Sequence, residues 1–225
     1  MSGESGSGDD VAPPQARLWR APAVLGLVMI CCAIELTLMA ADAGLVGTRL
    51  WRGIVYQNGA FWAGLLDNWR PNFPLQPLSM FVTYAFLHGG FWHLAGNMVA
   101  LAFLSDIALQ RVGQGAFAMI YGVSALGGAI VFGLLTQSAS PMVGASGALF
   151  GLAGAWQFWR WCDLCDEGLS RLPVWRTTGG LVVLNFMMWW LMEGALAWET
   201  HLGGFIFGWG VAYFVNLCNH MKKFN

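Results

Sequence analysis

Charged side chains are scarce in this sequence. Of the 225 residues, 10% are Asp, Glu, Lys or Arg, whereas about 25% is usual for a soluble domain. So few charges cannot cover a water-soluble globule of this size, and a disordered chain would carry more of them. The net charge of −1 also lacks the basic excess with which proteins bind nucleic acid. These deficits exclude a soluble globular domain, a disordered chain and a nucleic-acid partner.

Metal-binding cysteine pairs are scarce as well. The chain has 5 cysteines. Cys162 and Cys165 form one CxxC pair without a second, whereas a structural zinc site takes about four ligands. We therefore interpret them as ordinary cysteines and expect neither a metal nor another cofactor.

Apolar residues are abundant, at 57% of the chain, with 13 Trp and 15 Phe. A helix needs about 20 largely apolar residues to cross a bilayer. Apolar residues run on rather than alternate, which argues against a membrane β-barrel. The sequence predicts an all-α polytopic protein of the lipid bilayer, a bundle of six transmembrane helices at about 21–41, 78–105, 114–137, 143–160, 178–197 and 201–219.

Residues 1–17 are Gly, Ser, Asp, Pro and Ala without an apolar period, and they predict a disordered tail. The membrane domain then takes up 18–225. The tail lacks the basic start and cleavage site of a signal peptide.

Basic residues near the span ends predict the orientation, because Lys and Arg favour the cytoplasmic side. With both termini inside, the outer segments hold only Arg49, Arg52 and Arg70. The inner segments hold Arg17, Arg20, Arg111, Arg160, Arg171, Arg176, Lys222 and Lys223. The connection 41–77 is then an outer loop, and its many Trp, Phe and Leu residues favour a position half-submerged at the interface.

Polar groups inside spans are costly and indicate function. His93 and Asn97 are four residues apart and share a helix face, with His88 nearer the outer end. Ser146 and His201 each stand near the start of a span. Taken singly, each fits a structural role.

Small residues point to close contact between two of these spans. Gly147 and Gly151 in the fourth span have the same spacing as Gly204 and Gly208 in the sixth. Such faces let helices approach closely. The sequence therefore predicts that Ser146 and His201 lie together.

The polar residues also agree in depth. The second, fourth and sixth spans run in the same direction. At about 1.5 Å per residue, Ser146, His201, Asn97 and His93 fall about 21 to 27 Å from the inner ends of their helices. All four belong to one layer below the outer surface.

That layer holds the groups for acyl transfer. A serine hydroxyl needs a base to take its proton, and His201 is the base predicted beside Ser146. No carboxylate is placed to orient His201, so a Ser–His dyad is predicted rather than a triad. Phe150, one turn after Ser146, could pack on the imidazole. Donors for the oxyanion would be His93, Asn97 and the N–H of Ser146.

These residues carry a resemblance. HGGFWHLAGN (88–97), GASG (144–147) and HLGGFIFG (201–208) are similar to the motifs of the rhomboid intramembrane serine proteases of the bacterial six-span type. The resemblance covers about residues 20–220. It implies Ser146 as nucleophile, His201 as base, and an oxyanion site from His93 and Asn97. It also implies supporting roles for His88, Gly144, Gly147, Phe150, Gly204 and Gly208.

The resemblance further implies cleavage of single-span membrane proteins near the outer face of a bacterial cell membrane. There are departures from the family pattern. The family's Trp-Arg pair is absent from its usual place ahead of the first histidine, and Phe150 stands where Tyr is frequent. Two alternatives stay open: a catalytically inactive rhomboid-like protein that binds membrane clients, and a small transporter with a histidine relay.

Overall fold

A computed structural model describes residues 21–221 as helices joined by turns, with no strand in that range. Near the start lie α2 (Pro22–Asp42), α3 (Trp51–Gly59), η1 (Ala63–Leu66), α4 (Gln76–Thr83) and η2 (Tyr84–Phe86). They are followed by α5 (Phe91–Leu135), α6 (Ser146–Asp166), α7 (Leu172–Leu191) and α8 (Trp198–Met221). The predicted all-α class is confirmed. The tail 1–17 and the basic residues Arg17, Arg20, Lys222 and Lys223 lie outside the described residues.

The 45-residue helix α5 is two helices joined at a kink. Gly113 has φ 74° and ψ −179°, a non-helical conformation. Glycine reaches positive φ without steric cost. The halves of α5 correspond to the second and third predicted spans, and together with α2, α6, α7 and α8 they make the bundle of six long helices.

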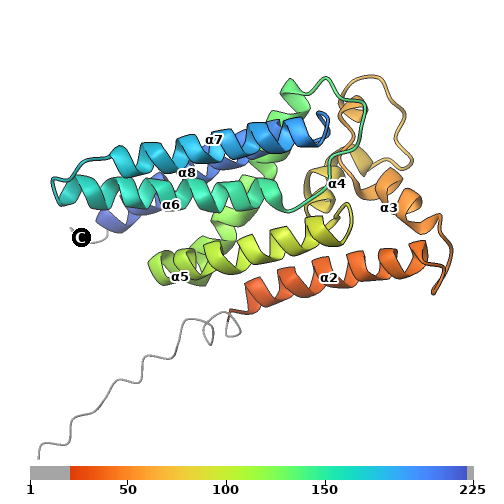
Figure 1. Ribbon diagram of the computed structural model, residues 1–225, viewed down its shortest axis with the longest axis horizontal. Helices are drawn as coiled ribbons and strands as arrows, with labels where there is room; N and C mark the ends of the chain where they lie inside the picture. The colour runs from red at the N-terminus through yellow and green to blue at the C-terminus, as the bar shows by residue number, and fades with distance from the viewer. Residues whose placement is uncertain (1–20, 222–225) are drawn as a thin grey trace, which may run out of the picture.

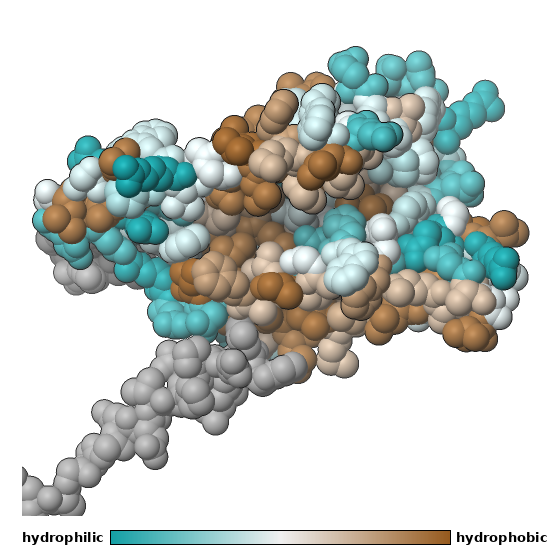
Figure 2. Space-filling view, in the orientation of Figure 1, coloured by the Kyte–Doolittle hydropathy of each residue, from teal (hydrophilic) through white to brown (hydrophobic). Residues whose placement is uncertain are grey.

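Three described helices are long and apolar enough to cross a membrane by composition: Pro22–Asp42, Phe91–Leu135 and Trp198–Cys218. Helix α6 has 21 residues, and many of them are buried Gly and Ala that face neighbouring helices. Helix α7 has 20 residues and contains Arg, two Thr and Asn among its apolar residues. Figure 2 shows apolar side chains over the middle of the face in view, with hydrophilic ones mainly toward its ends.

The predicted second span begins too early. Its start at 78 is wrong, because α4 and η2 occupy that stretch and the long helix begins only at Phe91. Gly90, with φ 109°, precedes the helix as its N-cap. His88 therefore lies in the turn ahead of α5 and not within a span.

Helices α5, α6 and α8 form the centre of the bundle and pack against one another. Glycine makes the α6–α8 contact possible: a Cβ on Gly204 would overlap the carbonyl oxygen of Gly147, and one on Gly208 would overlap that of Gly151. Figure 1 shows α6, α7 and α8 running alongside one another. Helix α7 is the exception in packing, since Val174 is its one buried residue.

The connection 41–77 contains α3 and η1, which Figure 1 shows beside α4 at one end of the bundle. Phe61 in this connection is fully buried. It exchanges two backbone hydrogen bonds, of 3.0 and 2.9 Å, with Met142 in the segment leading into α6. The connection is thus attached to the chain that presents Ser146. Its depth in the bilayer stays a prediction.

Candidate active site

Ser146 and His201 come together where α6 and α8 begin. Ser146 is the first residue of α6, and His201 lies in the first turn of α8. The Nε2 atom of His201 lies 2.8 Å from the Oγ atom of Ser146, within hydrogen-bonding distance. His201 is 6% exposed. The structure thus joins two residues that are 55 positions apart in the chain.

Phe150 packs flat against the ring of His201. The ring centroids are 4.2 Å apart and the ring planes differ by 6°. Phe150 lies one turn after Ser146, so the helix that presents the serine also holds the plane of the imidazole.

His93 lies in the first turn of α5, and its Nε2 atom is directed toward Gly144, shortly before Ser146. The backbone N–H of Gly89 donates to its Nδ1 atom over 3.1 Å. Because Nδ1 accepts a hydrogen bond, the proton of the neutral ring resides on Nε2. A Cβ on Gly144 would stand 2.8 Å from that Nε2 atom. His93 therefore presents an N–H donor close to the backbone that precedes Ser146.

Asn97 provides a second donor. Its Nδ2 atom is buried, and it donates to no group in the part of the chain that the structure describes. It stands 3.7 Å from the position of a Cβ on Gly144. Ser146 adds its own N–H, because the first N–H groups of a helix have no carbonyl four residues earlier. Gly144 itself has φ 126°, which strains any larger residue.

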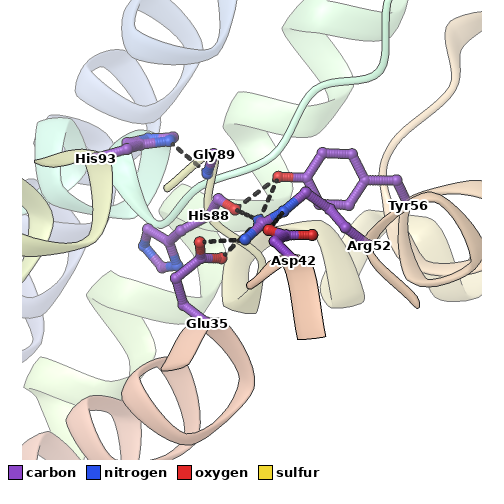
Figure 3. Close-up of polar contacts among 7 residues, drawn as sticks. All are labelled: Glu35, Asp42, Arg52, Tyr56, His88, Gly89 and His93. Atoms are coloured by element: carbon purple, nitrogen blue, oxygen red, sulfur yellow. Dashed lines mark hydrogen bonds and ion pairs between the residues drawn. The ribbon is translucent and has the colours of Figure 1, made fainter. Parts of the chain in front are cut away.

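An ion-pair network supports the turn that holds His93 (Figure 3). Arg52 of α3 binds both carboxylate oxygens of the fully buried Glu35 in α2, over 2.9 and 3.1 Å. Arg52 and Tyr56 also donate to the backbone carbonyl of His88, over 3.1 and 2.6 Å. The next residue, Gly89, holds the imidazole of His93.

Charge and burial act in opposite directions on Arg52. Burial opposes its positive charge, but hydrogen bonds to Glu35, Asp42 and Tyr56 raise its pKa above the usual value. For Tyr56 burial acts the other way and raises the pKa, against the lowering effect of Arg52. Both side chains therefore keep the protonated form with which they donate to the His88 carbonyl. His88 is itself fully buried, and its ring packs edge-on against His93 at 5.2 Å.

A cavity of about 480 Å³ opens over the contact between Ser146 and His201. It exposes His93, Ser146 and His201 to a common space. Its wall includes bulky apolar side chains from α5, from α7 and from the residue that follows α7, namely Trp92, Met188, Trp189 and Met192. This volume lies within the range of about 300–1,000 Å³ that is typical of ligand pockets.

Asn185 of α7 is a polar contact that sequence reasoning missed. Its Oδ1 atom lies 2.8 Å from Nδ1 of His201, opposite the nitrogen that faces Ser146. The signal was present in the sequence, because Asn185 is the one amide in the apolar run 181–191. The group at Nδ1 of His201 is thus the amide of Asn185 and not a carboxylate.

Metal ligands are not grouped in the described part of the chain. Residues 21–218, whose side chains the structure describes, contain no cluster of three His, Cys, Asp or Glu side chains that could hold a metal ion. Cys162 and Cys165 are free thiols on α6, and the Sγ atom of Cys165 accepts a hydrogen bond from Arg171 over 3.1 Å.

Comparison with known proteins identifies the family. A family model described as the Rhomboid domain matches residues 75–217, more than half of the 225 residues. RHOMBOID-like protein 5 of Arabidopsis thaliana is 31% identical over 140 residues, covering 59% of this chain and 42% of that protein.

Two further relatives have similar identity. Rhomboid protein 1, mitochondrial, of Saccharomyces cerevisiae is 32% identical, over 57% of this chain and 40% of its own length. Rhomboid-like protease 3 of Toxoplasma gondii is 31% identical, over 66% of this chain and 56% of its own length. The matches thus span about half the length of these relatives. With the membrane-spanning helices, the match of the family model shows that this chain is an integral membrane protein of the rhomboid family.

Proposed function

We propose that this protein is an intramembrane serine endopeptidase that cleaves single-span membrane proteins. The 2.8 Å contact between Ser146 Oγ and His201 Nε2 carries the proposal. Both residues line the cavity, as does His93, and the Nδ2 atom of Asn97 is directed at Gly144 beside it. A relative from Toxoplasma gondii is named as a protease, which agrees with this chemistry.

The first half of the reaction forms an acyl-enzyme. Ser146 Oγ attacks the carbonyl carbon of the scissile bond while His201 Nε2 accepts the hydroxyl proton. The carbonyl oxygen becomes an oxyanion, to which His93 Nε2–H, Asn97 Nδ2–H and the Ser146 N–H donate. The C–N bond then breaks, and the leaving amine takes the proton from His201.

The second half reverses the proton movements with water in place of the amine. Water gives its proton to His201 and attacks the acyl carbon. Collapse of this second oxyanion releases the carboxyl product and returns the proton to Ser146 Oγ. No metal or other cofactor takes part in these steps.

The side of the membrane on which cleavage occurs follows from orientation. We place both termini inside, on the basis of the Lys and Arg distribution. In Figure 1, α2 begins and α8 ends toward the left of the view, away from α3 and α4. Ser146 and His201 then lie toward the outer face. Residence in a bacterial cell membrane stays a prediction, since the relatives described come from a plant, a yeast and Toxoplasma gondii.

Incubation of the purified protein with a fluorescent transmembrane substrate tests the proposal. The wild-type protein should cleave it, and Ser146→Ala should abolish cleavage without altering thermal unfolding, because a single oxygen is removed. Ser105→Ala is the matched control: Ser105 is also buried, but its Oγ atom bonds within its own helix, to Ala102 O. Cleavage by Ser146→Ala at the wild-type rate would overturn the mechanism.

The same variants separate the alternatives. A serine-reactive fluorophosphonate should label the wild-type protein and Ser105→Ala but not Ser146→Ala. A client-binding protein without activity would retain the substrate uncleaved and would not be labelled. A transporter would lose transport on substitution of the histidines but not on Ser146→Ala.

A further inference from the structure

Helix α7 packs on the bundle through a narrow stripe that ends at Asn185. Val174 is buried, and Thr178, Leu181 and Asn185 follow at helical spacing with intermediate exposure. The residues on either side of Asn185 face outward, with Leu184 52% and Phe186 63% exposed. An amide in such a place is costly unless it has a partner. Its partner is His201.

The two ring nitrogens of His201 have different partners. Nδ1 faces Asn185 Oδ1 and Nε2 faces Ser146 Oγ, each at 2.8 Å. An amide oxygen only accepts hydrogen bonds, so Nδ1 must carry the ring proton. The lone pair of Nε2 then points at the hydroxyl of Ser146. This is the tautomer that a general base requires.

Stacking on Phe150 leaves the imidazole of His201 able to rotate within its own plane, and the contact with Asn185 prevents this rotation. A stacked aromatic ring restrains tilting of the imidazole, but it resists rotation within the ring plane only weakly. Hydrogen bonds at Nδ1 and Nε2, on separate edges of the ring, prevent that rotation. The contact with Asn185 also persists when Nε2 becomes protonated, because Nδ1 is a donor in both states.

We propose that Asn185 is a positioning residue that holds His201 in the orientation and tautomer needed to activate Ser146. The inference rests on the proposed function of the Ser146–His201 pair. Helix α7 then has a second role in the site besides lining the cavity, because its outer half carries Asn185, which orients His201.

Asn185→Leu tests this assignment, since leucine has the same number of side-chain heavy atoms, branches at the same carbon and suits an apolar helix. It should lower kcat about 10- to 100-fold, part of the usual contribution of a general base. KM should change little, because the loss concerns the transition state. Val183→Leu is the control, on the exposed side of the same helix, and it should keep the wild-type kcat.

Asn185→Asp tests the hydrogen bond itself. A carboxylate oxygen accepts from the same Nδ1–H, so kcat should recover relative to Asn185→Leu, and the acidic limb of the pH–rate profile should move to higher pH. A residue that only packs α7 would give no such movement. Loss of activity in Asn185→Asp equal to that in Asn185→Leu would overturn the proposal, as would a wild-type kcat in Asn185→Leu.

Nitrogen-15 NMR supplies a readout that does not depend on turnover. The chain has 4 histidines, so the signals of His201 can be assigned by substitution. Nδ1 should be protonated in the wild-type protein, and Asn185→Leu should give a mixture of tautomers. An unchanged tautomer in Asn185→Leu contradicts the role of Asn185. Cleavage that persists in Ser146→Ala contradicts the proposed function instead, so the two failures are distinguishable.

Discussion

Substitution of Gly204 by Ala should separate Ser146 from His201 without touching either residue. The added Cβ would overlap the carbonyl oxygen of Gly147 and would stand 2.7 Å from its carbonyl carbon. These are backbone atoms, so no side-chain rotation can relieve the overlap. Carbon atoms in contact stay about 3.5–4.0 Å apart, so α6 and α8 must move apart by about 1 Å.

That movement acts directly on the dyad. Gly147 follows Ser146, and Gly204 lies one turn after His201. The contact between Oγ and Nε2, now 2.8 Å, would lengthen beyond the ~3.2 Å limit of good hydrogen bonds. Misplacement of a catalytic group by about 1 Å can lower a rate about 100-fold, which is the loss of kcat expected for Gly204→Ala.

The same overlap should lower stability. Overpacking a core costs about 1–3 kcal/mol, while Gly→Ala in a helix returns roughly 0.5–1 kcal/mol. Gly210→Ala is the matched control in α8, because a Cβ there meets nothing within 4 Å. It should keep the wild-type kcat and unfold at the same or a higher temperature.

The assay measures kcat with a transmembrane substrate and thermal unfolding in detergent for both variants. Equal activity of Gly204→Ala and Gly210→Ala would refute the reasoning, since the α6–α8 separation would then not determine the geometry of the dyad.

The remaining predictions concern the oxyanion donors and the support of their turn. Asn97→Ala should lower kcat more than it raises KM, by about 10²-fold or less, because His93 also donates; an unchanged kcat with a large rise in KM would make Asn97 a binding residue. Glu35→Leu should lower the free energy of unfolding by about 3 kcal/mol, the low end for a broken buried ion pair, because Arg52 is partly exposed. Asp42→Leu, which removes a carboxylate that is 40% exposed from the same arginine, should cost less than about 1 kcal/mol in chemical denaturation; equal losses would contradict the assignment of Glu35 as the main partner.

Local properties of the sequence were sufficient for the helical class and for most helix positions. Hydropathy over about 20 residues reports whether a segment can lie in lipid, and this depends little on the rest of the chain. The prediction failed at 78–90, where apolar residues continue but the backbone breaks. Gly89 and Gly90 marked that break, and hydropathy does not register it.

Motif spacing likewise placed Ser146 and His201 on one small-residue interface, because glycine faces dictate which helices approach closely. Their catalytic roles remain predictions until the variants are measured. The spacing of four residues also predicted that the side chains of His93 and Asn97 lie on the same face of one helix.

The partners of single polar residues were decided only by the tertiary structure. Glu35 had no evident partner in the sequence and pairs with Arg52, 17 positions later, while Asn185 meets His201 across 16 positions. Such contacts depend on the rotation of each helix about its axis and on the path of the intervening loop. The sequence by itself therefore determined the membrane-spanning helices and the residues available for chemistry. The docking of α7 and α3 decided which groups contact His201 and the turn beside His93, because a hydrogen bond requires a match within a few tenths of an ångström that no local pattern encodes.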